Sequence, residues 1–259
     1  MQDLKVNLVQ FDIIWEDSEA NLKKLDGIMD DIHGSDLIIL PEMFNTGFSM
    51  NPQHVAQSEK GDAVQWLIQR SAVMATTIVA SVAIEEHGNY FNRCYVASYG
   101  KIIARYDKRN CFTLAHEDKF YQSGDQRVVF QIKEWKIKPL ICYDLRFPLW
   151  CYNHEDADIL LFVANWPESR ISHWDSLLQA RAIENQAFVI GVNRVGLDGN
   201  NNRYNGHSSV ITPYGNYQLG PLAESGVFVT QIDREEIVRY RKMFNLLAEE
   251  KVKSGNDTI

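Results

Sequence analysis

Apolar and polar residues alternate at the start of the chain. Leu4, Val6 and Leu8 alternate with Lys5 and Asn7, which predicts a β-strand with one buried face. Short apolar runs recur along the rest of the sequence and predict further strands at 36–40, 76–84, 93–99, 101–106, 127–132, 136–142, 158–165, 187–193, 206–213 and 226–232.

Apolar residues at helical spacing predict helices between several of these strands. One helix is expected from Ser18, as the N-cap, to Gly34, as the stop. A second helix is expected over 61–75, and another is expected to begin near Phe147 or Pro148.

Two capping patterns predict helices in the second half of the chain. Ser172 and Asp175 match a capping box in front of a helix over 173–186. Asp233 and Glu236 repeat the pattern before a C-terminal helix.

The order of these elements indicates a single α/β domain over residues 1–259, since strands and helices alternate without a linker or a repeat. A composition of 45% hydrophobic and 23% charged residues is typical of a globular protein with a sizeable core. The net charge of −8 argues against a nucleic-acid partner, because binding phosphates requires a basic surface.

The sequence also bears on the compartment. No apolar run is long enough to cross a bilayer, and the N-terminus lacks the pattern of a signal peptide. The four cysteines show neither a disulfide framework nor zinc-ligand spacing. We therefore expect a cytoplasmic protein that has no membrane partner and no metal site.

Three chemically complementary side chains stand at or within two residues of the ends of predicted strands. They are Glu42, Lys108 and Cys142. In α/β proteins the loops that leave the C-terminal ends of strands carry the chemistry. A thiol with an ordinary pKa of about 8.5 needs a base or a cation to become a nucleophile. A carboxylate can take its proton, and a lysine can stabilise both the thiolate and the oxyanion formed by attack on a carbonyl.

Two other interpretations of Cys142 remain open at this point. A free cysteine is among the most buried residue types, so the thiol could serve packing alone. A Cys–His enzyme is the second alternative, in which Cys142 pairs with His116, His173 or His207.

Three segments carry a family resemblance. They are "LPEMFNTGF" (40–48), "YDKRNCF" (106–112) and "PLICYDLRFP" (139–148). They resemble, in this order, the three signature segments of the carbon–nitrogen hydrolase (nitrilase) superfamily, and the likeness extends through 165–196 and 205–215. The wording is most similar to the omega-amidase branch, which hydrolyses the side-chain amide of 2-oxo dicarboxylic acid monoamides such as 2-oxoglutaramate and 2-oxosuccinamate.

The resemblance implies a four-layer α-β-β-α sandwich, usually as a homodimer, and a mechanism without a metal or an organic cofactor. Glu42 resembles the general base that activates Cys142, whose attack on the amide gives a thioester. Lys108 and the backbone N–H of Tyr143 resemble the oxyanion hole. Glu117 matches the second glutamate, which helps to position the lysine and the substrate.

An omega-amidase substrate carries a carboxylate, so the pocket must supply a cation besides Lys108. Arg146 is one candidate, and Arg109 and Arg170 are others. An equally weighted alternative for Arg146 is an ion pair with Asp144 that holds the turn. Three aromatic residues beside the motifs are expected to line the pocket: Phe44, Phe112 and Trp166.

The resemblance leaves two alternatives to an omega-amidase. The first is a nitrilase, or an amidase of another small aliphatic substrate, that uses the same residues. The second is a non-catalytic member of the fold that acts as a binding or interaction protein, against which the intact Glu42, Lys108 and Cys142 argue.

Overall fold

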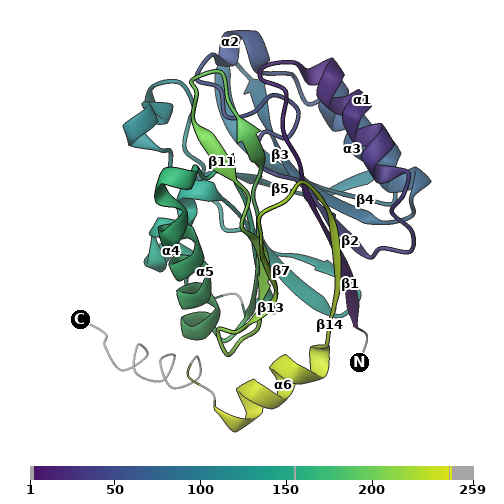
Figure 1. Ribbon diagram of the computed structural model, residues 1–259, viewed down its shortest axis with the longest axis vertical. Coiled ribbons are helices and arrows are strands. Elements are labelled where there is room, and N and C mark those ends of the chain that lie inside the picture. The colour runs from purple at the N-terminus through teal and green to yellow at the C-terminus, as the bar shows by residue number, and fades with distance from the viewer. Residues whose placement is uncertain (1–2, 155, 245, 247–259) are drawn as a thin grey trace.

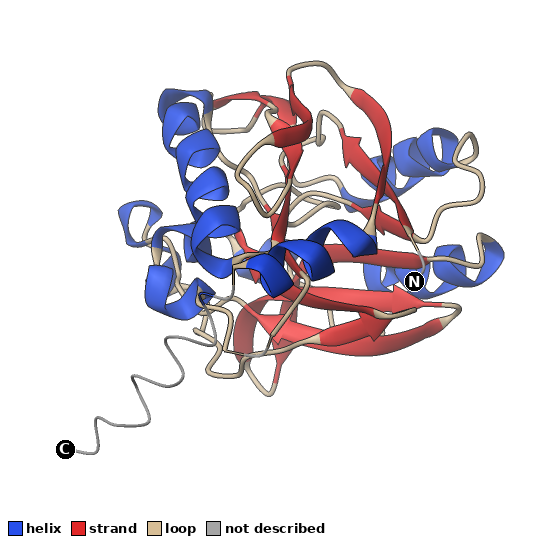
Figure 2. Ribbon diagram, turned by 90° about the horizontal axis from the view of Figure 1, so that it is seen from below, coloured by secondary structure: helices blue, strands red, loops and turns tan. Residues whose placement is uncertain are grey.

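The computed structural model describes residues 3–154, 156–244 and 246, and it contains two six-stranded β-sheets packed face to face. Helices α1 (Ser18–Met29) and α3 (Asp62–Val73) lie on one side, and α4 (Pro148–Cys151) and α5 (Ile171–Asn185) lie on the other (Figure 1). The view from below also shows helices flanking the strands on both sides (Figure 2). The expected α-β-β-α sandwich is confirmed.

The first sheet has the strand order β14–β1–β2–β3–β4–β5. Its strands, in that order, are Gly226–Ile232, Leu4–Gln10, Leu37–Ile39, Thr77–Glu86, Asn89–Ser98 and Lys101–Asp107. β1, β2 and β3 are parallel, whereas β4 is antiparallel to both β3 and β5. β2 and β5 therefore run in the same direction and end at the same edge of the sheet.

The second sheet has the order β13–β12–β9–β8–β7–β6. Its strands, in that order, are Tyr217–Leu222, Ser208–Ile211, Phe188–Val192, Ile159–Val163, Trp135–Ile141 and Phe130–Ile132. The central strands β7, β8 and β9 are parallel. The short strands β10 (Val195–Leu197) and β11 (Arg203–Asn205) form a separate pair.

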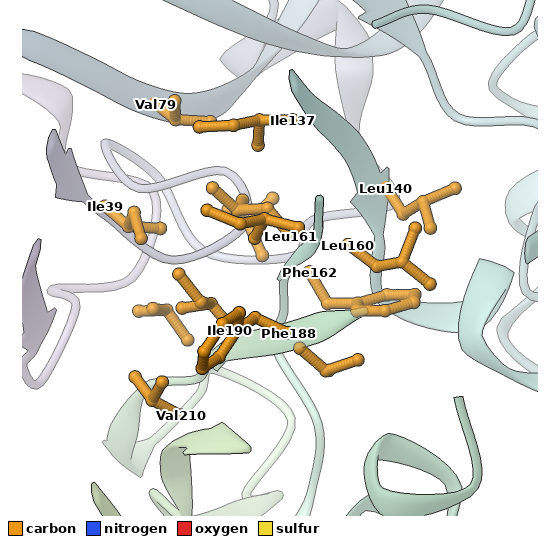
Figure 3. Close-up of a cluster of buried hydrophobic side chains, with 14 of the residues drawn as sticks. Ile39, Val79, Ile137, Leu140, Leu160, Leu161, Phe162, Phe188, Ile190 and Val210 are labelled. Carbon is orange, nitrogen blue, oxygen red and sulfur yellow. The ribbon is translucent and has the colours of Figure 1, made fainter. Parts of the chain in front are cut away.

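Aliphatic side chains fill the space between the two sheets (Figure 3). Ile39 and Val79 come from the first sheet, and Leu161 and Ile190 from the second, and all four are fully buried. Burying one such side chain contributes about 1.5–3 kcal/mol. This core fixes the two sheets against each other and so fixes the strand ends that carry the reactive residues.

Close packing also holds α5 on the outer face of the second sheet. A Cβ atom at Gly191 would lie 2.6 Å from a methyl carbon of Leu178 and 2.7 Å from the ring of Trp174. Glycine at this position of β9 therefore lets the helix approach the strand.

The prediction that β1 has one polar, exposed face is wrong. Asn7 is only 5% exposed, and Val9 packs with Leu25 of α1 and Leu67 of α3. Because β1 is covered by the other sheet on one face and by helices on the opposite face, both of its faces are buried except at Lys5, which is half-buried.

Two predicted helix limits also differ. Asp17, not Ser18, is the N-cap of α1, and its side chain accepts a hydrogen bond of 3.0 Å from the backbone N–H of Ala20. The helix ends at Met29, before the expected stop at Gly34.

The two capping-box predictions had different outcomes. α5 begins at Ile171 without a side-chain cap, and Asp175 instead pairs with His207. At α6 (Arg234–Met243) Asp233 is the N-cap and accepts a hydrogen bond from the N–H of Glu235.

The sequence pattern did not predict the strands β10, β11 and β13 or the four-residue helix α2 (Pro52–Val55). Among the helices of the described residues, none combines the length and apolar character needed to span a membrane.

Candidate active site

The ends of β2, β5 and β7 bring three of the predicted residues into one cluster. Glu42 follows β2 by three residues, Lys108 follows β5 directly, and Cys142 follows β7 directly. The first two come from one sheet and the third from the other. Lys108 Nζ lies 2.9 Å from Glu42 Oε1, and the charges of both groups act on the Cys142 thiol.

Lys108 is buried, with an exposed fraction of 1%, and it is held by two fully buried carboxylates. Its Nζ donates to Glu42 and also lies 3.0 and 2.9 Å from the two carboxylate oxygens of Glu117. Burial disfavours the ammonium, but the charges of Glu117 and Glu42 outweigh this effect and raise the pKa of Lys108 well above its usual value. The lysine therefore remains a cation although it is buried.

Glu117 lies at the start of a short 3-10 helix, η2 (Glu117–Lys119), in the loop after β5. Besides Lys108, it accepts a hydrogen bond from the backbone N–H of Phe112. Burial raises the pKa of Glu117, while the charge of Lys108 opposes this shift. The second glutamate matched by the family motif thus contacts the lysine directly.

Cys142 is the first residue of a tight turn, the 3-10 helix η3 (Cys142–Arg146), and has a φ of 44°. A non-glycine residue in this left-handed region is held there by its surroundings. The buried Asp144 supplies that support, because its carboxylate accepts hydrogen bonds from the backbone N–H of Ile141 (3.0 Å), the hydroxyl of Tyr106 (2.7 Å) and both the backbone and the side chain of Asn110 (2.9 Å each).

The resting state of Cys142 is a thiol. Burial raises its pKa well above the usual value, the negative charge of Glu42 raises it further, and the positive charge of Lys108 lowers it. A nucleophilic role therefore requires that a base remove the proton during attack, and the Glu42 carboxylate is placed beside it.

Two asparagines that the sequence analysis did not single out orient the glutamates. The side-chain amide of Asn92, on β4, donates to Glu42 at 2.8 Å and to Glu117 at 3.3 Å. The backbone N–H of Asn165, just after β8, donates to Glu42 Oε2 at 2.8 Å, and its side-chain amide donates to the Glu42 carbonyl. Asn165 ends a predicted strand, which is a weak sequence signal, whereas Asn92 gives none.

Cys142 opens into a cavity of about 270 Å³. Five segments contribute to its wall, represented by Phe48, Phe112, Cys142, Trp166 and Tyr204. A space of this size suits a small molecule rather than a polymer. The arrangement places a carboxylate and a cation next to a thiol that lines a small cavity, which is the set of groups needed for acyl transfer from an amide.

The profile of the carbon-nitrogen hydrolase family matches residues 5–242. The chain belongs to the carbon–nitrogen hydrolase family. It is therefore a hydrolase that acts on carbon–nitrogen bonds other than peptide bonds.

Relatives within this family agree with the expected branch. "Omega-amidase YafV" of Escherichia coli (strain K12) is 44% identical over 215 residues, which cover 83% of this chain and 84% of that protein. "2-oxoglutaramate amidase" of Bacillus subtilis (strain 168) is 34% identical over 243 residues, covering 92% and 93%. The resemblance to the omega-amidase branch is confirmed.

A solved structure supports the assignment to the carbon–nitrogen hydrolase family. XC1258 from Xanthomonas campestris, a CN-hydrolase superfamily protein with an arsenic adduct in its active site, superposes with a TM-score of 0.92 at 38% identity. The superposition covers 96% of this chain and 97% of that one.

In this carbon–nitrogen hydrolase, three of the four residues predicted for the pocket line the cavity, namely Phe112, Arg146 and Trp166. The fourth, Phe44, does not. It is fully buried in the core beneath α3, where its ring centroid lies 5.6 Å from that of Trp66. An apolar residue next to a signature glutamate can point into the core as readily as into the pocket, and the sequence pattern does not distinguish the two.

The three candidate arginines differ in their position relative to the cavity. Arg146 and Arg170 line the cavity, whereas Arg109 is exposed and donates to the carbonyl of Gly124 at 3.0 Å. The alternative of an Arg146–Asp144 ion pair is wrong, because Arg146 Nη2 instead lies 3.1 Å from His173 Nδ1.

The geometry does not favour a Cys–His pair. His207 pairs with Asp175 at 2.9 Å, and His173 contacts Arg146. None of the residues that line the cavity within the described ranges is a histidine, so His116 is not placed there either.

Proposed function

We propose that this enzyme is an omega-amidase that converts 2-oxo dicarboxylic acid monoamides, such as 2-oxoglutaramate and 2-oxosuccinamate, to the 2-oxo dicarboxylate and ammonia. The observation that carries the proposal is the buried cluster of Glu42, Lys108 and Cys142 at a small cavity that also contains two arginines. The relatives named as omega-amidase and 2-oxoglutaramate amidase supply the substrate class.

In the acylation half-reaction, the Glu42 carboxylate takes the proton from Cys142 while Sγ forms a bond to the amide carbon. The carbonyl oxygen becomes an oxyanion, which the ammonium of Lys108 and the backbone N–H of Tyr143 stabilise. Glu42 then passes its proton to the amide nitrogen, the C–N bond breaks, and ammonia leaves. The product of this step is a thioester on Cys142.

Water completes the reaction. Glu42, again a carboxylate, takes a proton from the water as its oxygen attacks the thioester carbon. The tetrahedral intermediate collapses by breaking the C–S bond, and Glu42 returns the proton to the departing sulfur. The enzyme regains its thiol, and the acyl group leaves as the carboxylic acid product, which ionises.

Glu117 has a supporting role in this scheme. With Glu42 alone, Lys108 would have one carboxylate partner, and proton transfer to Glu42 would leave the buried ammonium without a counter-charge. Because Glu117 holds Lys108 through two oxygens, the lysine stays in place while Glu42 changes its protonation state.

The substrate carboxylate binds at the other end of the cavity in this proposal. Arg146 supplies a guanidinium, and the rings of Phe112 and Trp166 contact the carbon chain. The four free cysteines are compatible with the reducing cytoplasm in which we place the enzyme.

We also infer that residues 1–259 form one carbon–nitrogen hydrolase domain and that two copies assemble into a homodimer. Sedimentation velocity of the purified protein tests the assembly. A single species with twice the mass of the chain supports a dimer, and a species with the mass of one chain contradicts it.

Ammonia release tests the proposed substrate class. The purified protein is given 2-oxoglutaramate, 2-oxosuccinamate, glutamine, asparagine and a short aliphatic nitrile in parallel. We expect the 2-oxo amides to be hydrolysed with the highest kcat/KM. A nitrile that reacts faster than every amide would indicate a nitrilase instead, and no reaction with any of them would contradict the proposed activity.

A further inference from the structure

The residues two positions before and two positions after Lys108 bind one carboxylate, that of Asp144. The hydroxyl of Tyr106 donates to Asp144 Oδ2 at 2.7 Å, and both the backbone N–H and the side-chain amide of Asn110 donate to Oδ1 at 2.9 Å. Tyr106 lies on β5 of the first sheet, and Asn110 lies in the loop that follows this strand. One side chain therefore holds the chain on both sides of the lysine.

Asp144 itself belongs to the turn that carries Cys142. It lies two residues after the cysteine, in η3, and its Oδ2 also accepts a hydrogen bond of 3.0 Å from the backbone N–H of Ile141, the last residue of β7 in the second sheet. The same oxygen therefore bonds to both sheets. We call these four residues, Tyr106, Asn110, Ile141 and Asp144, the inter-sheet clasp.

The clasp depends on a buried negative charge. Asp144 is fully buried, and it forms no ion pair with any residue that the structure describes. Burial raises its pKa, whereas its hydrogen bonds and the charge of Lys108 oppose this shift. A buried charge costs free energy even when it is hydrogen-bonded. Its place between the two reactive residues points to a role in positioning them.

Glu42, which the first sheet also supplies, is linked to the second sheet by a different hydrogen bond. Its Oε2 accepts from the backbone N–H of Asn165, just after β8. The hydrogen bonds of Lys108 Nζ within the described ranges lead only to Glu42 and Glu117, which follow strands of the first sheet. The clasp therefore supplies the hydrogen bonds that join the segment of the lysine to the turn of Cys142.

We propose that Asp144 is a positioning residue that sets the distance between the Cys142 thiol and the Lys108 ammonium through the inter-sheet clasp. The inference rests on the roles that the proposed function gives to these two groups. An oxyanion that forms on the carbon bonded to Sγ must lie within hydrogen-bond distance of the ammonium. An error of about 1 Å in such an arrangement costs about 10²-fold in rate. The apolar core holds the sheets together, while the clasp fixes their spacing at the reactive edge.

Two substitutions weaken the clasp to different degrees. Tyr106→Phe removes one hydrogen bond and keeps the ring in the core between the sheets. Asp144→Asn keeps the shape of the side chain but presents an NH2 group to hydrogen-bond donors. Tyr95→Phe is the matched control, because Tyr95 is also buried in the first sheet but packs on the opposite face, where its hydroxyl donates to Glu59 at 3.3 Å.

Turnover of 2-oxoglutaramate gives the first readout. We expect kcat to fall by about tenfold in Tyr106→Phe and by at least about 100-fold in Asp144→Asn, with KM within about threefold of the wild type. Tyr95→Phe should match the wild type. Each rate is measured below the thermal transition of the variant, so that unfolded protein does not contribute to the loss. An unchanged kcat in Asp144→Asn, or a loss that appears only in KM, would overturn the proposal.

Alkylation of Cys142 by iodoacetamide gives a second readout that requires no turnover. The charge of Lys108 lowers the pKa of the thiol, so a displaced lysine should stabilise the thiolate less. We expect Tyr106→Phe to raise the pH midpoint of alkylation by at least about 0.3 pH unit in the wild-type background and by less than about 0.1 pH unit in the Lys108→Met background.

This double-mutant cycle distinguishes positioning from a general structural effect. Equal shifts in the two backgrounds would overturn the proposal, since the clasp would then act on the thiol without the lysine. The absence of a shift in Tyr106→Phe would overturn it as well. If the wild type releases no ammonia from 2-oxoglutaramate, the proposed function fails, but the alkylation cycle still decides whether the clasp positions Lys108 against Cys142.

Discussion

Glu42 and Lys108 act on the Cys142 thiol in opposite directions. The negative charge of Glu42 adds to the effect of burial and raises the pKa of the thiol, whereas the positive charge of Lys108 lowers it. The two groups also have opposite chemical tasks in the proposed mechanism, as the base and the oxyanion cation. Their electrostatic effects can therefore be separated from their effects on turnover.

Glu42→Gln is expected to lower the pKa of Cys142, so that alkylation by iodoacetamide begins at a lower pH than in the wild type. Lys108→Met is expected to raise this pKa and to shift alkylation to a higher pH. Both variants should lose turnover by about 10³-fold, because each lacks a group that acts in the transition state. The measurement is the pH dependence of Cys142 alkylation, followed by peptide mass. Shifts in the same direction, or retained turnover in either variant, would contradict the account.

Asn92 is expected to act as a positioning residue, because its amide bridges the two glutamates. Asn92→Ala should lower kcat by about 10–100-fold, since a carboxylate displaced by about 1 Å is a poorer base. Asn89→Ala is the control on the same strand; Asn89 is exposed, and its side chain donates only to the carbonyl of His87 within the described residues. An Asn92→Ala enzyme with normal kcat would show that the bridge is dispensable.

At the scale of the residue, the sequence predicted the residues whose chemistry is distinctive and missed those whose role depends on their position in the fold. Glu42, Lys108 and Cys142 were found because a base, a cation and a nucleophile followed three strands. Asn92 was missed because an asparagine near a strand is common, and its two contacts lie 50 and 25 residues away along the chain. Phe44 and Phe112 looked alike in sequence, yet one lies in the core and the other at the cavity.

At the scale of the element, hydrophobic patterns located the longer strands and helices, while capping patterns were less reliable. The Ser172–Asp175 pair looks like a capping box, but Asp175 is engaged by His207, which follows β11, and so it does not cap α5. The polarity of β1 was also misjudged, since only the packing of two layers around it buries Asn7. Local pattern cannot report a partner that comes from another element.

The caps give a direct test of these assignments. Asp17→Ala removes the side chain that caps α1 and should lower the free energy of unfolding by about 1 kcal/mol. Ser172→Ala removes a side chain with no cap bond and should change it by less than about 0.5 kcal/mol. Urea unfolding of the two variants measures both values. A larger loss for Ser172→Ala than for Asp17→Ala would reverse the assignment.

At the scale of the whole molecule, the candidate site exists because two sheets face each other. One sheet supplies Glu42 and Lys108 through parallel strands that end at the same edge, and the other supplies Cys142. The order of the strands in a sheet cannot be inferred from the hydrophobic pattern. The pattern alone therefore predicted an α/β domain but not its architecture. The four-layer arrangement followed from the family resemblance, and the core between the sheets explains how it is held (Figure 3).

Ammonia release from 2-oxoglutaramate by the wild type and by Cys142→Ala tests the central claim most directly. The account predicts that Cys142→Ala loses at least about 10³-fold in kcat while its thermal unfolding stays close to that of the wild type. Cys151→Ala, which removes a fully buried thiol outside the cavity, is the control and should retain turnover. Ammonia release by Cys142→Ala at the wild-type rate would contradict the account, since the nucleophile would then lie elsewhere.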